Sequence, residues 1–119
     1  MNSNQGISSE IMDLIDLDDV EAVVLFRIDG NVVEASFGSK YSQGLLRTIQ
    51  WCKANVEKVS LEMKTNNLKK VTYELNDFCV LFFVVNKVTI LTTLANQNIN
   101  LSLLSIEAKR KSQIISSFL

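Results

Sequence analysis

The sequence has no histidine and no proline, and it has only two cysteines among its 119 residues. Histidine performs most general acid–base steps near neutral pH, so its absence excludes Ser-His-Asp and Cys-His nucleophilic sites. It also removes the commonest metal ligand, and two cysteines in separate apolar segments are too few for a structural zinc site. We therefore expect no catalytic residues, no bound metal and no enzymatic activity.

The two cysteines are interpreted as small buried hydrophobic residues. Cys52 lies in the apolar stripe of a predicted helix, and Cys79 lies in an apolar strand. A disulfide between them would require Cα atoms within about 7 Å and an oxidising compartment. The first ten residues have neither the basic start nor the apolar run of a secretory signal, so a cytoplasmic location is expected.

The charge pattern also lacks features on which several binding functions depend. The net charge is −1, which gives no basic face of the kind that nucleic-acid binding needs. The pattern Gly-x-x-x-x-Gly-Lys-Ser/Thr, which cradles nucleotide phosphates, is absent, and no cofactor is expected. Hydrophobic residues make up 47% of the chain, enough for a single domain across residues 1–119 to bury a core.

Two apolar β-runs lie between Val20 and Phe37, separated by Asp29-Gly30-Asn31. Asp-Gly and Gly-Asn both supply the positive φ angles of tight hairpin turns, so two registers are open. The register centred on Gly30-Asn31 would also set Arg27 opposite Glu34. Both registers place the following residues on one apolar face: Val24, Phe26, Ile28, Val33, Ala35 and Phe37.

Residues 78–95 form an almost uncharged run, nearly long enough for a transmembrane helix, but Asn86-Lys87 lies at its centre. A lysine there would cost roughly 3 kcal/mol in a bilayer, whereas Val, Ile, Thr and Phe favour strands. We therefore predict a hairpin around Asn86-Lys87, with Phe83 opposite Ile90 and Leu81 opposite Thr92, and no insertion into a membrane. This register gathers on one face Cys79, Leu81, Phe83, Val85, Val88, Ile90 and Leu94.

The segment Leu68–Leu75 alternates between apolar and polar residues, which predicts a strand with one exposed face. The turn into the following hairpin is predicted at Asn76-Asp77. The apolar face carries Val71, Tyr73 and Leu75, and the polar face carries Lys70, Thr72 and Glu74.

Two helices are predicted before this strand. Ser8 or Ser9 would cap a short first helix, and the second would run from about Tyr41 to Lys64. The apolar residues of the second helix fall within an arc of about 80°, which is typical of a core-facing stripe. That stripe contains Tyr41, Leu45, Ile49, Cys52, Val56, Val59 and Met63.

A third helix is predicted to begin near Asn98 or Asn100 and to run to the C-terminus. A basic cluster on its middle turn, Lys109–Lys111, is interpreted as a solvated helix face. The apolar stripe of this helix contains Leu101, Leu104, Ala108, Ile115 and Phe118.

These elements predict an α/β protein, an α+β sandwich in the order α-β-β-α-β-β-β-α. A five-stranded antiparallel sheet would carry the long helix on one face and the N- and C-terminal helices on the other. In this order, and in Val20–Ser36 with its Asp29-Gly30 turn, the chain resembles the roadblock family of dynein light chains, lysosomal GTPase scaffolds and bacterial polarity regulators. The resemblance covers about Leu17 to Leu104, and it departs from the family at Ala22, where glycine is frequent.

The resemblance implies a non-enzymatic platform. Roadblock domains form dimers in which the second helices pack side by side and the third strands pair, and they bind, regulate or scaffold small Ras-like GTPases. It therefore implies a homodimer, or a pair with another roadblock chain, and a small Ras-like GTPase as the partner.

The residues of the second helix support a dimer independently. Trp51 lies about 120° from the centre of the core stripe, and small residues beside it would let a second helix approach closely. Gly44 within a helix costs up to about 1 kcal/mol relative to alanine, which indicates a packing role. The predicted interface comprises Gly44, Thr48, Trp51, Asn55, Lys70, Thr72 and Glu74. The alternative is that Trp51 packs under a loop of its own chain.

Other interpretations remain open at this point. A cluster of acids from Asp13 to Glu21 is typical of solvated residues but could also meet a basic partner or a divalent cation. Of the three arginines, Arg110 is expected to be free to contribute charge to a bound GTPase. The alternative function is a small-molecule-sensing module, or one of the longin or profilin type, with an apolar cavity beside the sheet.

Overall fold

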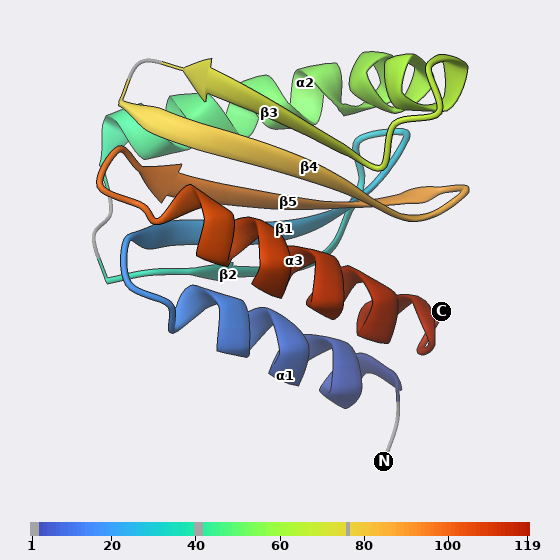
Figure 1. The fold of residues 1–119 in the computed structure, drawn as a ribbon, viewed down its shortest axis with the longest axis horizontal. Helices are drawn as coiled ribbons and strands as arrows, with labels where there is room; N and C mark the ends of the chain where they lie inside the picture. The colour runs from blue at the N-terminus through green and yellow to red at the C-terminus, as the bar shows by residue number, and fades with distance from the viewer. Residues whose placement is uncertain (1–2, 40–41, 76) are drawn as a thin grey trace.

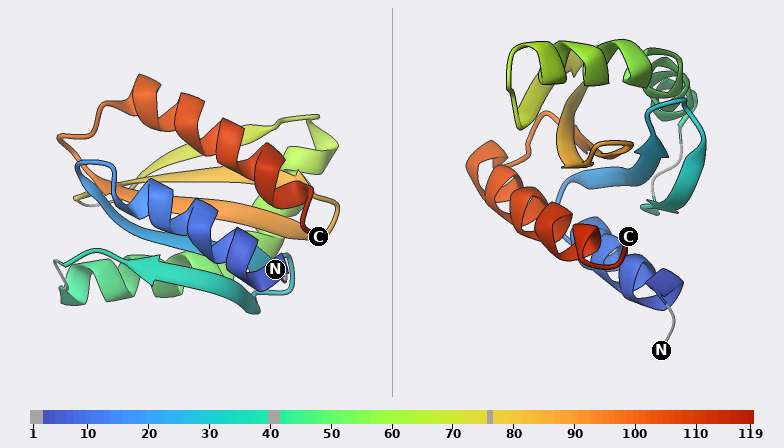
Figure 2. Two further views of the ribbon diagram at one scale, coloured as in Figure 1. Left: turned by 90° about the horizontal axis from the view of Figure 1, so that it is seen from below. Right: turned by 90° about the vertical axis from the view of Figure 1, so that its right-hand side faces the viewer.

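The computed structural model describes residues 3–39, 42–75 and 77–119, and it confirms the predicted order of elements (Figure 1). The elements are α1 (Ser3–Ile15), β1 (Val20–Arg27), β2 (Val32–Phe37), α2 (Gln43–Thr65), β3 (Lys70–Leu75), β4 (Phe78–Asn86), β5 (Thr89–Asn96) and α3 (Leu101–Ser116). The strands form one antiparallel sheet in the order β2-β1-β5-β4-β3, so β2 and β3 are its edges. Figure 2 shows α2 on one face and both α1 and α3 on the other, as predicted.

The sheet separates two hydrophobic cores. Strands β1, β4 and β5 are buried on both faces because helices cover them from both sides, which explains their almost continuous apolar sequences. No described helix combines the length and the apolar character needed to cross a membrane. The core under α1 and α3 includes Ile11, Leu14, Val23, Leu25, Leu81, Phe83, Leu91, Leu104, Ala108 and Ile115. The core under α2 includes Val24, Phe26, Leu45, Cys52, Val56, Val59, Met63, Val80, Phe82, Ile90 and Leu94.

The β1–β2 hairpin adopts the register centred on Asp29-Gly30, with Val24 opposite Ala35. Arg27 therefore does not lie opposite Glu34; its Nε forms an ion pair with Asp29 Oδ2 at 3.5 Å. Gly30 has a φ of +93°, a backbone conformation in which a residue with a side chain would be strained. Within the described residues α2 packs on β1, β5, β4 and β3 but not on β2. The predicted apolar face is thus uncovered at its edge, where Val33 and Phe37 are 40% and 54% exposed.

The predicted register of the β4–β5 hairpin is wrong by one residue. Phe83 lies opposite Leu91, and Asn86 lies opposite Thr89, so the loop is Lys87-Val88. The Asn86 side chain accepts a hydrogen bond from Val88 N at 3.0 Å, and the ladder has a bulge between Val84 and Asn86. As a result Ile90 and Leu94 lie under α2 rather than on the face of Leu81 and Phe83.

The helix ends differ from the predictions in part. Helix α1 begins at Ser3, not near Ser8 or Ser9, whereas the predicted cap Asn100 is confirmed and accepts from Leu103 N at 3.1 Å. The stripe of α3 is buried in its middle, but Leu101 and Phe118 are 40% and 36% exposed. The helix ends at Ser116 and not at the C-terminus as predicted, so Phe118 lies beyond it. Two predicted residues, Tyr41 and Asn76, lie outside the described residues.

Helix α2 has well-defined ends. Ser42 caps its start and accepts a hydrogen bond from Leu45 N at 3.0 Å. At its other end, Leu68 N donates to Met63 O and Asn67 N donates to Lys64 O, which is the pairing of a Schellman motif. Asn67 occupies the left-handed position of that motif, with a φ of +54°. The chain therefore reverses within two residues and enters β3 beside the helix end.

Candidate functional site

Three aromatic rings tie the flank of α2 to the edge of the sheet. The Trp51 ring lies 5.4 Å from the Tyr73 ring and 6.5 Å from the Phe82 ring, measured between centroids. Tyr73 and Phe82 meet edge to face at 5.8 Å. Burial raises the pKa of the Tyr73 hydroxyl, with a further contribution from the Glu62 carboxylate. Trp51 therefore packs on strands β3 and β4 of its own chain, not under a loop, and it remains half-buried.

The other predicted helix residues differ in exposure. Thr48 is only 4% exposed, and its hydroxyl donates to Gly44 O at 2.8 Å. Asn55 is half-buried, and its amide donates to Trp51 O at 2.8 Å. Thr48 is therefore almost fully buried in its own chain, whereas Asn55 keeps part of its surface exposed beside Trp51.

Gly44 has no steric reason to be glycine within its own chain. A Cβ atom there would meet the Phe78 ring at 3.7 Å and Ser42 Oγ at 3.8 Å, which are ordinary contact distances. Its φ is not in the left-handed region, and the residue is exposed near the start of α2. The cost of glycine in this helix is therefore not explained by packing inside the described chain.

Strand β3 offers a free edge beside this flank. Within the part of the chain that the structure describes it pairs with β4 alone, and its residues alternate strictly between exposed and half-buried, as predicted. Lys70, Thr72 and Glu74 are the exposed residues. Between α2 and β3 lies a hollow of about 240 Å³ lined by Arg47, Thr48, Trp51 and Leu75. Of the seven predicted residues, Thr48 and Trp51 line this hollow. Lys70, Thr72 and Glu74 lie on the exposed side of the alternating strand, where Lys70 Nζ donates to Ser105 Oγ of α3 at 3.4 Å.

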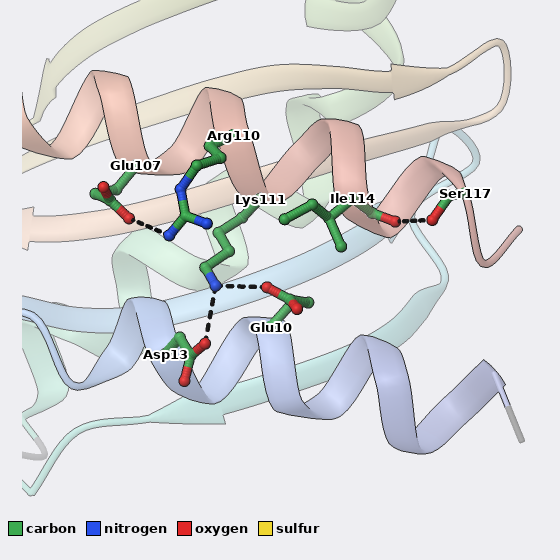
Figure 3. A network of polar contacts seen from close by, with 7 residues as sticks. All are labelled: Glu10, Asp13, Glu107, Arg110, Lys111, Ile114 and Ser117. Carbon is green, nitrogen blue, oxygen red and sulfur yellow. Dashed lines mark hydrogen bonds and ion pairs between the residues drawn. The ribbon is translucent and has the colours of Figure 1, made fainter. Parts of the chain in front are cut away.

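The basic cluster of α3 is not a uniformly solvated face. Lys111 is only 4% exposed, and its Nζ contacts Glu10 Oε2 at 2.5 Å and Asp13 Oδ2 at 2.8 Å on α1 (Figure 3). Burial alone would lower the pKa of Lys111, but the hydrogen bonds to Asp13 and Glu10 raise it above its ordinary value. The sequence spacing could have indicated the burial of Lys111, because this residue lies three positions after Ala108 of the apolar stripe.

Several of the remaining charged candidates also have hydrogen-bond or ion-pair partners within the chain. Arg110 pairs with Glu107 at 2.8 Å, and the Asn96 amide donates to both Asp19 (3.1 Å) and Glu21 (3.0 Å). No cluster of three or more His, Cys, Asp or Glu side chains that could hold a metal ion occurs in the described part of the chain. Arg47 is the arginine without an ion pair there, so the prediction that Arg110 is free is wrong.

Comparison with known proteins places these features in a family and a fold. The sequence profile of a family described as AF0774-like protein matches residues 3–109. No curated protein matches the chain. The fold is similar to that of MglC from Myxococcus xanthus, with a TM-score of 0.79 and 11% identity over 98% of this chain and 99% of MglC.

Two further solved structures show the same fold. A Roadblock/LC7 domain from Streptomyces avermitilis has a TM-score of 0.75 and 14% identity over 93% of this chain and 95% of that one. A structure described as MglB with tetrameric arrangement has a TM-score of 0.80 and 8% identity over 98% and 89%. Identities this low establish the fold alone, and the fold is the roadblock fold that the sequence resemblance implied.

Proposed function

Because this chain belongs to the AF0774-like protein family and has the roadblock fold, we propose that it is a non-enzymatic dimeric platform that binds a small Ras-like GTPase and regulates or scaffolds it. Its partner in the dimer is a second copy of itself or another roadblock chain. The cytoplasm is the location that fits this role. The tetrameric arrangement in the description of the MglB relative supports self-association as a property of this fold.

The observation that carries the dimer is the surface formed by α2 and β3. It combines an exposed glycine that its own chain does not require, a half-buried tryptophan beside an open hollow, and a free strand edge. Free strand edges are normally covered, and tryptophan is among the residues that contribute most to interfaces. A second copy placed by a two-fold axis would cover all three features at once.

The arrangement of the arginines bears on how a GTPase would be regulated. Arg27 and Arg110 are engaged by Asp29 and Glu107, and Arg47 lines the hollow of the proposed dimer interface. A dimer through this surface would therefore occupy the one unpaired arginine of the described residues. Regulation would then act by ordering the switch loops of the GTPase, which shifts conformational populations without donating catalytic charge.

Two measurements test this proposal. Light scattering on a sizing column should give twice the 13.4 kDa mass of the chain at micromolar concentration. Each Ras-like GTPase of the source organism, loaded with GDP or with a non-hydrolysable GTP analogue, should then be tested for binding to the immobilised protein. A monomeric mass would contradict the homodimer. Failure to bind any of these GTPases in either state would favour a ligand-sensing module instead.

A further inference from the structure

A pocket of about 550 Å³ lies at the end of the sheet where three segments meet: the C-terminal turn of α2, the entry into β3 and the β4–β5 hairpin. Figure 1 shows these three segments together at the right-hand end of the molecule. The apolar part of the lining includes Met63, Val85 and Ile90, which are almost fully buried in the two cores. The pocket therefore has an apolar floor that is formed by core residues.

The charge around this pocket has one sign. Lys64, Lys69 and Lys87 line it, one from each of the three segments, and no aspartate or glutamate lines it. None of these three ammonium groups forms an ion pair or a hydrogen bond within the described residues. By contrast Lys53 donates to Gly30 O and Lys111 to two carboxylates. Three unpaired cations gather here in a chain whose net charge is −1.

Backbone hydrogen bonds fix the turns that carry these lysines, whose side chains are exposed. The Schellman motif at Asn67 fixes the chain reversal between Lys64 and Lys69. The hydrogen bond from Val88 N to Asn86 Oδ1 fixes the two-residue loop that carries Lys87. The carbonyls of Glu62, Met63 and Lys64 at the end of α2 already accept backbone N–H groups. These hydrogen bonds partly neutralise the negative end of the helix dipole, so the carbonyls repel a bound anion less.

We propose that this pocket binds a small amphiphilic anion, an apolar group that carries a phosphate or a carboxylate. The volume lies within the range of about 300–1,000 Å³ that is usual for small-molecule sites. The apolar floor would take the hydrocarbon body, and the three lysines would surround the anionic head as point charges. The pocket shares no lining residue with the hollow between α2 and β3, so this inference does not depend on the dimer or on GTPase binding.

The test uses n-hexyl phosphate as the probe and compares it with n-hexanol and with inorganic phosphate. Each is titrated into the full-length ¹⁵N-labelled chain while the amide resonances are followed. n-Hexyl phosphate should shift the amides of residues 64–69 and 84–90, and its affinity should exceed that of both halves of the molecule. Equal affinity for n-hexanol, or no shifts at these residues, would overturn the proposal.

Matched charge variants separate the pocket from general electrostatic attraction. Lys64→Gln/Lys87→Gln should weaken the binding of n-hexyl phosphate by about tenfold, since two of the three cations that line the pocket are lost. Lys58→Gln/Lys109→Gln changes the net charge equally at exposed sites outside the pocket, and it should leave the affinity within twofold. An equal loss of affinity in both double variants would contradict a specific binding site in the pocket.

A second arm distinguishes the two sources of such an anion. Vesicles of phosphatidylcholine with and without phosphatidylglycerol are sedimented with the protein and with both double variants. Binding that requires phosphatidylglycerol and is lost only in Lys64→Gln/Lys87→Gln would identify a lipid headgroup as the ligand. Pocket binding of n-hexyl phosphate without vesicle binding would identify a free amphiphile.

Discussion

The indole ring of Trp51 packs edge-on against the phenol ring of Tyr73, with 5.4 Å between the two centroids. This contact joins the flank of α2 to the edge strand β3. It explains why Trp51 is half-buried in one chain and also borders the open hollow. The contact therefore sets the relative position of the helix and the strand that form the proposed interface.

Gly44→Lys should convert the dimer to a monomer while the fold keeps its stability. The chain itself leaves room for a Cβ at this position, so a long charged side chain would clash only with a second helix. Light scattering measures the mass, and thermal unfolding followed by circular dichroism measures the stability. Ala54→Lys, at an exposed position of α2, serves as the control and should remain dimeric. Trp51→Glu should also dissociate the dimer, but its loss of ring contacts makes it a less specific test.

Arg47→Ala should not abolish GTP hydrolysis by a cognate GTPase, because the platform is proposed to donate no catalytic charge. Binding and single-turnover hydrolysis should both be measured for this variant and for Arg27→Ala and Arg110→Ala. An arginine finger contributes about 10³–10⁵-fold to hydrolysis, so a loss of about a hundredfold or more with intact binding would indicate one. Such a result for any one variant would replace the platform by a charge-donating activator.

Lys111→Met should lower the free energy of unfolding by about 1–3 kcal/mol, because Glu10 and Asp13 would face each other without a counter-ion. Urea denaturation measures the change. Lys109→Met, at an exposed position two residues away, should stay within about 0.5 kcal/mol. Adding Glu10→Gln and Asp13→Asn to Lys111→Met should recover most of the loss. If the triple variant is no more stable than the single one, the lysine contributes packing rather than charge.

Ionisation of the Cys52 thiol in the unfolded chain should lower the free energy of unfolding at alkaline pH. Burial raises the pKa of its thiol to about 12, whereas an unfolded chain ionises near pH 9. Between these values only the unfolded state releases the proton, so the free energy of unfolding falls by about 1.4 kcal/mol per pH unit. Urea denaturation from about pH 9.5 to 11 should show this slope reduced by that amount in Cys52→Ala. Val56→Ala, a buried variant without a titrating group, should keep the wild-type slope.

Asn67→Ala should destabilise the protein by about 1 kcal/mol, because alanine is strained at a φ of +54°. Asn67→Gly should be neutral or slightly stabilising, since glycine is the preferred residue of the Schellman motif. Thermal unfolding measures both variants. Thr65→Ala, an exposed neighbour within the helix, should change the stability by less than about 0.5 kcal/mol. Equal losses for alanine and glycine would show that the Asn67 side chain, not its backbone angle, matters.

The element order, the strict alternation of β3, the buried stripe of α2 and a hairpin turn at either Asp29-Gly30 or Gly30-Asn31 were all predictable from sequence. Each depends on neighbours within a few residues: positive φ at a turn, a period of two in a strand, a period near 3.6 in a helix. Together with the lengths of the helices and strands, these local signals were enough to indicate the roadblock fold. The same periodicity placed Thr48 and Trp51 off the core stripe, whereas Thr48 is only 4% exposed and Trp51 packs on the buried Phe82.

Tertiary structure alone decided the strand registers, the role of Lys111 and the lysine-lined pocket. The bulge between Val84 and Asn86 shifts the β4–β5 ladder by one residue, and a side-chain period of two cannot reveal such a shift in strands that are apolar on both faces. Lys111 meets its two acids across about a hundred residues of chain, and the pocket gathers three lysines from three segments. Such long-range juxtapositions follow from how the layers pack, which local periodicity does not encode.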